Sequence, residues 1–238
     1  MTWFDHLFAL TLLLGLPAYA AWHVSRLARR VEADAADARV RDYILTIVLQ
    51  WSLTLTLLGW WVYAGRPFVN IGLATPKGSG RLWTIVLTAA AVTFFASQAR
   101  AVAQSAVAQG KIRAQLDSQP GVRVILPTTP RELRTFGGLA VTAGICEEIL
   151  YRGYLLYYLG AWLPGAAAVA AAVAVFGVAH VYQGRRGILL TGIAGAAAMG
   201  LYLLTGSLAA PIFLHITIDV ANGFMAYRVL TSPVAPPV

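Results

Sequence analysis

The fold and the chemistry of this chain are decided by the stretch Gly144-Ile145-Cys146-Glu147-Glu148-Ile149-Leu150-Tyr151-Arg152-Gly153. Two adjacent carboxylates and an arginine stand there inside a run that otherwise reads as membrane-spanning. An ionisable side chain at the centre of a bilayer costs at least about 2.5 kcal/mol. We therefore expect these three charged side chains to point into the protein and to meet partners there.

The composition predicts an all-α, polytopic membrane protein. Of the 238 residues 58% are hydrophobic and 12% are charged, and the mean hydropathy is +0.67. A soluble domain carries about 25% charged residues. A membrane β-barrel would instead show alternating segments of about ten residues between turns. The net charge of +8 is read as a topology signal, because basic residues gather in the loops that flank spans, and no nucleic-acid partner is expected.

About seven transmembrane helices are predicted from the apolar runs. They cover residues 3–22, 43–64, 82–102, 135–158, 164–182, 188–204 and 208–227. Residues 1–134 hold the first three spans with polar loops, residues 135–228 hold the core with the other four, and residues 229–238 form a flexible tail. Thr129, Pro130 and Glu132 have the spacing of a capped helix start.

The distribution of Lys and Arg sets the expected orientation. These residues concentrate in the loops after the first, third and fifth spans, whereas the loop after the second span has only Arg66, Lys77 and Arg81. Positively charged loops tend to stay on the cytoplasmic side. We therefore expect a multi-pass protein of the cell membrane, with the N-terminus outside and the C-terminus in the cytoplasm.

Polar residues recur in the last spans at helical spacing. Those in the fourth, fifth and seventh predicted spans are Glu147, Glu148, Arg152, His180, His215, Asp219 and Asn222. Glu148 and Arg152 are four residues apart and can pair on one helix face. The economical arrangement brings the three spans around one polar pocket, the predicted active site, in which Glu147 faces His180 and His215.

Such a pocket could hydrolyse a bond in two ways. A carboxylate in a poorly solvated site can act as general base toward a water molecule, and histidines can orient the water and donate to an oxyanion. The same side chains could instead ligate zinc, through Glu147, His180 and His215. Residue identities leave both routes open, so no cofactor is certain and zinc stays possible. Cys146 is expected to be a small buried hydrophobe and not a nucleophile.

The spacing of three motifs resembles that of a known family. The motifs are Glu147-Glu148-x-x-x-Arg152, Phe176-x-x-x-His180 and His215-x-x-x-Asp219, in this order and within spans. They resemble those of the CPBP family, the CAAX-protease and bacteriocin-processing membrane proteins also called Abi proteins. This family is related to the eukaryotic Rce1-type prenyl-protein proteases. The resemblance covers residues 127–227, and the first three spans carry none of it.

The resemblance implies roles for the motif residues. Glu147 would be the water-activating base, His180 its partner, and Glu148 with Arg152 a supporting pair. His215 and residue 219 would stabilise the oxyanion. The third motif commonly ends in Asn, whereas this chain has Asp219, which cannot donate when ionised. Asp219 would have to be protonated, orient His215 or bind a metal; otherwise Asn222 takes the donor role.

The resemblance also implies a substrate class. We expect an intramembrane endopeptidase that cleaves a membrane-anchored protein or peptide within the lipid bilayer, with a prenylated CAAX substrate as one option. One alternative is a non-catalytic membrane protein for immunity or partner binding that keeps the protease fold. Another is a transporter or channel that relays ions through intramembrane acids. The absence of acids and histidines from the second and sixth predicted spans disfavours that last reading.

Overall fold

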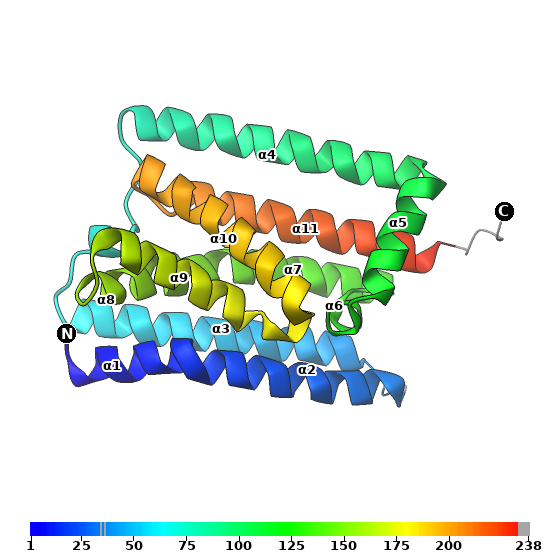
Figure 1. The fold of residues 1–238 in the computed structure, drawn as a ribbon, viewed down its shortest axis with the longest axis horizontal. Coiled ribbons are helices and arrows are strands. Elements are labelled where there is room, and N and C mark those ends of the chain that lie inside the picture. Colours follow the sequence, from blue (N-terminus) through cyan, green and yellow to red (C-terminus); the bar gives the residue numbers. More distant parts are fainter. Residues whose placement is uncertain (34, 36, 233–238) are drawn as a thin grey trace.

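The computed structural model describes residues 1–33, 35 and 37–232, and within them the regular elements are helices without a strand (Figure 1). Five helical segments of this part of the chain are long and apolar enough to cross a membrane. They are Trp3–Glu32, Ala38–Tyr63, Ser79–Gln104, Val181–Thr205 and Ala209–Thr231. The prediction of a polytopic all-α protein is thereby confirmed.

The elements follow one another with short connections. In chain order they are α1 (Trp3–Leu10), η1 (Thr11–Gly15), α2 (Leu16–Glu32), α3 (Ala38–Tyr63), η2 (Phe68–Ile71), α4 (Ser79–Gln104), α5 (Ala106–Asp117), α6 (Pro120–Ile125), α7 (Pro130–Glu147), η3 (Glu148–Leu155), α8 (Leu156–Gly160), α9 (Gly165–Ala179), η4 (Val181–Gln183), α10 (Gly184–Thr205) and α11 (Ala209–Thr231). Each of the seven predicted spans coincides with a helical segment. Whether all seven cross the membrane stays a prediction, because α9 is short and α7, η3 and α8 carry the charged residues.

One helix boundary differs from the sequence prediction and another agrees with it in detail. Helix α11 continues to Thr231, past the predicted start of the tail at residue 229, and residues 233–238 lie outside the described residues. Helix α7 begins at the predicted place. The Thr129 hydroxyl accepts a hydrogen bond from the Glu132 main-chain N–H, and the Glu132 carboxylate accepts from the Thr129 main-chain N–H. This capping box satisfies two N–H groups that the helix itself leaves free.

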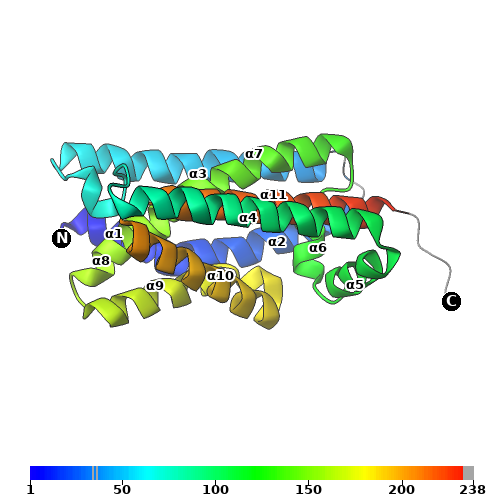
Figure 2. The same cartoon turned by 90° about the horizontal axis from the view of Figure 1, so that it is seen from above.

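The long helices lie side by side, and α7, which carries Glu147, has two of them as neighbours. It packs against α3 on one side and α11 on another, while α4 lies against α11 and α9 against α10. Seen from above, α3 and α7 lie along one side of the molecule and α9 and α10 along the other (Figure 2). The rod formed by α1, η1 and α2 runs beside α3 (Figure 1). Helix α7 and its continuation η3 therefore meet several other helices at the level of the Glu-Glu pair.

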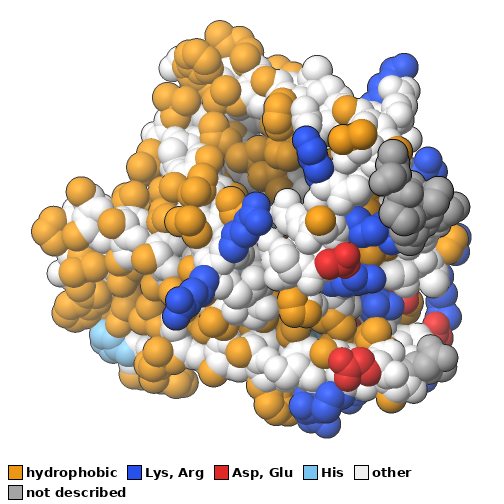
Figure 3. Space-filling model, turned by 45° about the vertical axis from the view of Figure 1, so that its right-hand side comes forward, with side chains coloured by type: hydrophobic (Ala, Val, Ile, Leu, Met, Phe, Trp, Pro, Cys, Tyr) orange, Lys and Arg blue, Asp and Glu red, His pale blue; other side chains and the backbone are white. Residues whose placement is uncertain are grey.

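Charged and apolar side chains separate on the surface. Large apolar side chains are exposed along the long helices, among them Trp3, Leu55, Leu82 and Phe213. In Figure 3 hydrophobic side chains cover much of one side of the face, whereas Lys, Arg, Asp and Glu gather toward the other. An apolar surface of this extent suits contact with lipid.

A buried ion pair fixes the N-terminal end of α1. Asp5 is fully buried, and its two carboxylate oxygens accept from both terminal nitrogens of Arg66, at 2.6 and 2.7 Å. The Tyr154 hydroxyl donates to the Asp5 carbonyl at 2.7 Å. Bidentate pairs of this kind define geometry as well as adding energy. They join the first helix to the loop after α3 and to η3, which carries the charged stretch.

Helices α7 and α11 are in close contact at a glycine, Gly144. A Cβ atom added at Gly144 would lie 3.0 Å from the main-chain nitrogen of Ile216. Gly144 is three residues from Glu147, and Ile216 follows His215. The absence of a side chain at Gly144 therefore sets the distance between the two helices that carry the predicted catalytic residues.

We predict that Gly144→Ala destabilises the protein by about 1–3 kcal/mol, because the new methyl group forces α7 and α11 apart. Gly137→Ala is the matched control, since it lies on the same helix and a Cβ there would meet nothing within 4 Å. Its effect should be neutral or slightly stabilising, because Ala favours helix more than Gly. Thermal unfolding of both variants in detergent tests this. Equal unfolding midpoints for the two would contradict the close contact.

Candidate active site

The charged stretch lies where an α-helix changes to a π-helix. Helix α7 ends at Glu147, and η3 runs from Glu148 to Leu155 with a wider turn. Such π-helical segments are rare and recur at functional sites. Successive side chains on a helix point about 100° apart. Glu147 and Glu148 consequently face different neighbours, and this separation gives them different environments.

Glu147 is bound by one donor and leaves one oxygen free. Its Oε1 accepts from the Nε2 of Gln50, on α3, at 2.8 Å. Its Oε2 is 3.8 Å from the Nε2 of His180 and has no hydrogen-bond partner among the described residues. The side chain is 16% exposed. A distance of 3.8 Å is too long for a direct hydrogen bond.

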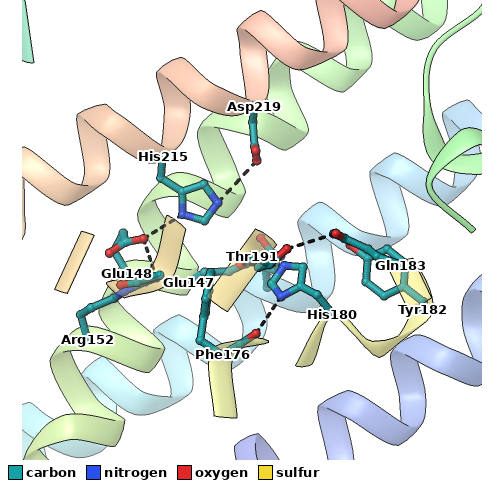
Figure 4. Close-up of polar contacts among 12 residues, drawn as sticks. Glu147, Glu148, Arg152, Phe176, His180, Tyr182, Gln183, Thr191, His215 and Asp219 are labelled. Atoms are coloured by element: carbon teal, nitrogen blue, oxygen red, sulfur yellow. Dashed lines mark hydrogen bonds and ion pairs between the residues drawn. The ribbon is translucent and has the colours of Figure 1, made fainter. Parts of the chain in front are cut away.

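His180 has a defined tautomer. It directly follows α9 as its C-terminal cap, and its Nδ1 lies 2.9 Å from the carbonyl oxygen of Phe176 (Figure 4). Because a carbonyl can only accept, Nδ1 must carry a proton. In the neutral imidazole the Nε2 then keeps a lone pair, and this nitrogen faces Glu147. Glu147 Oε2 and His180 Nε2 are thus two acceptors on either side of a short gap.

One carboxylate oxygen of Glu148, Oε1, accepts two hydrogen bonds. Its Oε1 accepts from Arg152 Nη1 at 2.7 Å and from His215 Nδ1 at 2.8 Å (Figure 4). Glu148 is completely buried, and Arg152 is 2% exposed with its guanidinium 3.8 Å from the centre of the Phe176 ring. The predicted pairing of Glu148 with Arg152 is present in the structure. A cation over an aromatic face adds further stabilisation.

The expected contact between Glu147 and His215 is not formed. The structure pairs His215 with Glu148, because η3 turns Glu148, and not Glu147, toward α11. The other ring nitrogen of His215, Nε2, is 3.5 Å from Asp219 Oδ2. Asp219 therefore faces His215, as its place one turn further along α11 suggests. Asn222 lines the same cavity, and its side chain makes no hydrogen bond among the described residues.

All seven predicted site residues line one cavity of about 630 Å³. Its walls are not confined to the three spans expected from the sequence. Side chains from α2, α3, α5, α6 and α10 also line it. Among them are His23 and Asp42, whose Nε2 and Oδ1 atoms are 2.6 Å apart. His23 follows the first predicted span, residues 3–22, and its spacing from Asp42 carries no motif.

Gln50 is the contact to Glu147 that sequence reasoning missed. It lies within the second predicted span, which has no acid or histidine, and an uncharged amide in a span does not by itself indicate a site. One signal was available in the pattern. Gln50 is a polar residue with Leu49 and Trp51 on either side, and polar side chains inside spans usually bond to another helix.

The side chains do not converge as zinc ligands. In the described part of the chain no group of three or more His, Cys, Asp and Glu residues is placed to hold a metal ion. The nitrogens of His215 are directed at Glu148 and Asp219, so that neither faces the gap between Glu147 and His180. The side chains Glu147, His180 and His215, which the sequence offered as zinc ligands, therefore do not share a centre.

Comparison with known proteins gives a match in the C-terminal part of the chain. Residues 129–221 match the family model described as Type II CAAX prenyl endopeptidase Rce1-like. This segment contains all three motifs, from Glu147 to Asp219, whereas Gln50 lies outside it. No curated protein and no solved structure matches the chain.

We predict that Arg152→Met destabilises the protein by about 3–5 kcal/mol, because it leaves the buried Glu148 carboxylate without its cation. The double variant Glu148→Gln with Arg152→Met should recover part of this loss, since neither buried charge remains. Thermal or denaturant unfolding of the single and double variants measures the difference. If the double variant is less stable than Arg152→Met, the loss in the single variant does not come from an unpaired Glu148 carboxylate.

Proposed function

We propose that this chain, whose residues 129–221 match the Rce1-like family model, is a member of that family and hydrolyses a peptide bond of a membrane-associated substrate with a water molecule activated by Glu147. The family implies CAAX-type protease activity in a membrane protein. The apolar helices agree with a substrate that is itself held in or at the bilayer. A prenylated CAAX-type protein is one such substrate.

The gap between Glu147 and His180 is the observation that carries this proposal. Oε2 of Glu147 and Nε2 of His180 are 3.8 Å apart, and both can accept a hydrogen bond. A water molecule bridging two such acceptors donates one hydrogen to each, and this leaves a lone pair of its oxygen directed elsewhere. Such a lone pair is what a nucleophilic water must present to a carbonyl carbon.

The proposed reaction follows from these contacts. The water oxygen bonds to the carbonyl carbon while one of its protons passes to Glu147. The carbonyl oxygen becomes an oxyanion, which the N–H groups of the pocket stabilise. The carbon–nitrogen bond then breaks as the proton held by Glu147 passes to the leaving nitrogen, which departs as an amine. The second proton of the water, still on the new carboxylic acid, passes to the amine or to solvent, and the new terminus is a carboxylate.

We propose that His215 supplies a donor for the oxyanion and that Asp219 orients it. Glu148 holds Nδ1 of His215, so the ring cannot turn freely. Because Nδ1 donates to Glu148, Nε2 carries a hydrogen only in the charged imidazolium form of the ring. In that form Nε2 faces Asp219 at 3.5 Å, a length that leaves its N–H weakly bound and available to a substrate oxygen. An ionised Asp219 needs no donor function in this arrangement. Asn222, on the cavity wall, is a second candidate donor.

We predict that Glu147→Gln and His180→Asn each lower hydrolysis by about 10²- to 10⁴-fold, the range of general acid–base catalysis. Both changes keep the size of the side chain near that of the original. The assay uses purified protein in lipid nanodiscs and a fluorogenic peptide, once with a prenyl anchor and once with an acyl anchor. Ser52→Ala is the control, since Ser52 is exposed and bonds only within its own helix.

The outcomes of this assay separate the possible functions. Cleavage of one anchored peptide and not the other defines the lipid that is recognised. Outside this assay, an effect of the protein in cells that is unchanged by Glu147→Gln would favour a non-catalytic immunity or partner-binding role and would contradict the proposal.

The charges of the cavity predict the substrate's polarity near the cleaved bond. Four acids line it, namely Asp42, Glu147, Glu148 and Asp219. Among the described residues of its wall Arg152 is the one Lys or Arg, and it is bound to Glu148. A substrate carboxylate in the cavity would therefore meet like charge without a free cation.

We predict that an Asp beside the cleaved bond lowers kcat/KM by at least about tenfold relative to an Asn in the same peptide. The Asn peptide is the matched control, because it has the same size and lacks the charge. Comparison of the two peptides at neutral pH measures the effect. An Asp peptide that is cleaved as fast as the Asn peptide would contradict the electrostatic reading of the cavity.

A further inference from the structure

We infer that Gln50 is a positioning residue for the reaction: its side-chain amide fixes the Glu147 carboxylate so that Oε2 stays turned toward His180. The inference rests on the proposed function, in which Glu147 is the base. It assigns a role to the second span, which lies outside the segment matched by the family model.

The contact itself is well defined. Gln50 lies on α3, which packs along α7, and its Nε2 is 2.8 Å from Glu147 Oε1. An ionised carboxylate accepts and cannot donate, so the amide must present its NH₂ group and not its oxygen. A hydrogen bond to a charged acceptor is stronger than one between neutral groups. Gln50 is therefore the one described side chain that donates to Glu147.

The same bond decides which oxygen of Glu147 is free. A glutamate side chain rotates about three bonds, and an unbound carboxylate exchanges its two oxygens readily. With Oε1 held by α3, Oε2 is left as the atom that faces His180 at 3.8 Å. Loss of the amide would free Glu147 to adopt other rotamers, and the fraction of molecules with Oε2 in place would fall. Reactions that depend on near-attack geometry are sensitive to such displacements.

The other end of the amide argues against a packing role. Gln50 Oε1 is buried and has no hydrogen-bond partner among the described residues. Gln50 lines the cavity together with Glu147 and His180. A glutamine that served only to join α3 to α7 would be expected to use both ends of its amide. The pairing actually present serves the carboxylate alone.

The neighbouring residue provides the contrast and the control. Trp51 Nε1 donates to Thr142 Oγ1 at 3.3 Å, and this bond also joins α3 to α7. It touches neither Glu147 nor His180. Thr142→Val removes it with little change in volume. Thr142→Val therefore tests what the loss of one hydrogen bond between these helices does by itself.

The experiment compares Gln50→Leu, Gln50→Glu and Thr142→Val in the nanodisc peptidase assay. Gln50→Leu should lower kcat by about 10- to 100-fold and change KM by less than about threefold, because the amide acts on the base and not on the substrate. Gln50→Glu keeps the shape of the side chain but cannot donate when ionised, so its kcat should fall at least as far. Thr142→Val should keep kcat within about threefold.

A further arm tests that Gln50 acts through Glu147. When Gln50→Leu is added to Glu147→Gln, the residual rate should stay within about twofold, because no carboxylate remains to be positioned. Thermal unfolding midpoints of all variants show that each is folded at the assay temperature.

Distinct results would overturn this inference or the proposed function. If Glu147→Gln is inactive while Gln50→Leu keeps kcat within threefold, Gln50 does not position the base and the proposed function stands. If Thr142→Val loses as much kcat as Gln50→Leu, the effect is helix packing and the inference fails. If Glu147→Gln hydrolyses the peptide like the wild type, Glu147 is not the base, and the proposed function falls together with the role of Gln50.

Discussion

The buried Glu148 carboxylate is the group on which the rest of this site depends. It is completely buried, and one of its oxygens accepts from Arg152 and from His215. A charge at such a place is tolerated only when it is paired and hydrogen-bonded. The pairing joins η3 to α11 across the bundle, and the close contact of Gly144 with Ile216 lets the two helices come near enough for it. Helix packing and charge neutralisation therefore set the position of His215 together.

The two adjacent glutamates differ because of their neighbours. Glu148 points at an arginine and an imidazole, whereas Glu147 has one amide donor and an oxygen left free beside His180. The π-helical turn that begins between them directs the two side chains to different helices. One carboxylate can then hold the structure together while the other stays available for chemistry. This division suits a hydrolase, which needs a base that no cation has already neutralised.

The sequence predicted the helices and the cluster well, and the partners less well. Ionisable residues in apolar spans must point inward, so the pattern correctly anticipated that Glu148 pairs with Arg152. It did not anticipate that His215 pairs with Glu148, because spacing along one helix does not tell which neighbour a π-helical turn faces. Gln50 was missed for another reason. An uncharged amide costs little in a span and forms no spaced motif, and its significance appears only when α3 packs on α7.

The first two predicted spans contribute to the cavity wall, although the family match begins at residue 129. Helix α3 supplies the donor to Glu147, and the Asp5–Arg66 pair with Tyr154 fixes η3 from the other end of the molecule. His23 and Asp42 extend the polar wall of the cavity into α2 and α3. A motif carries the reacting groups, but their geometry is imposed by helices with no motif of their own. For this reason the segment of residues 129–221 alone could not hold Glu147 as the whole chain does, since the donor that restrains it would be absent.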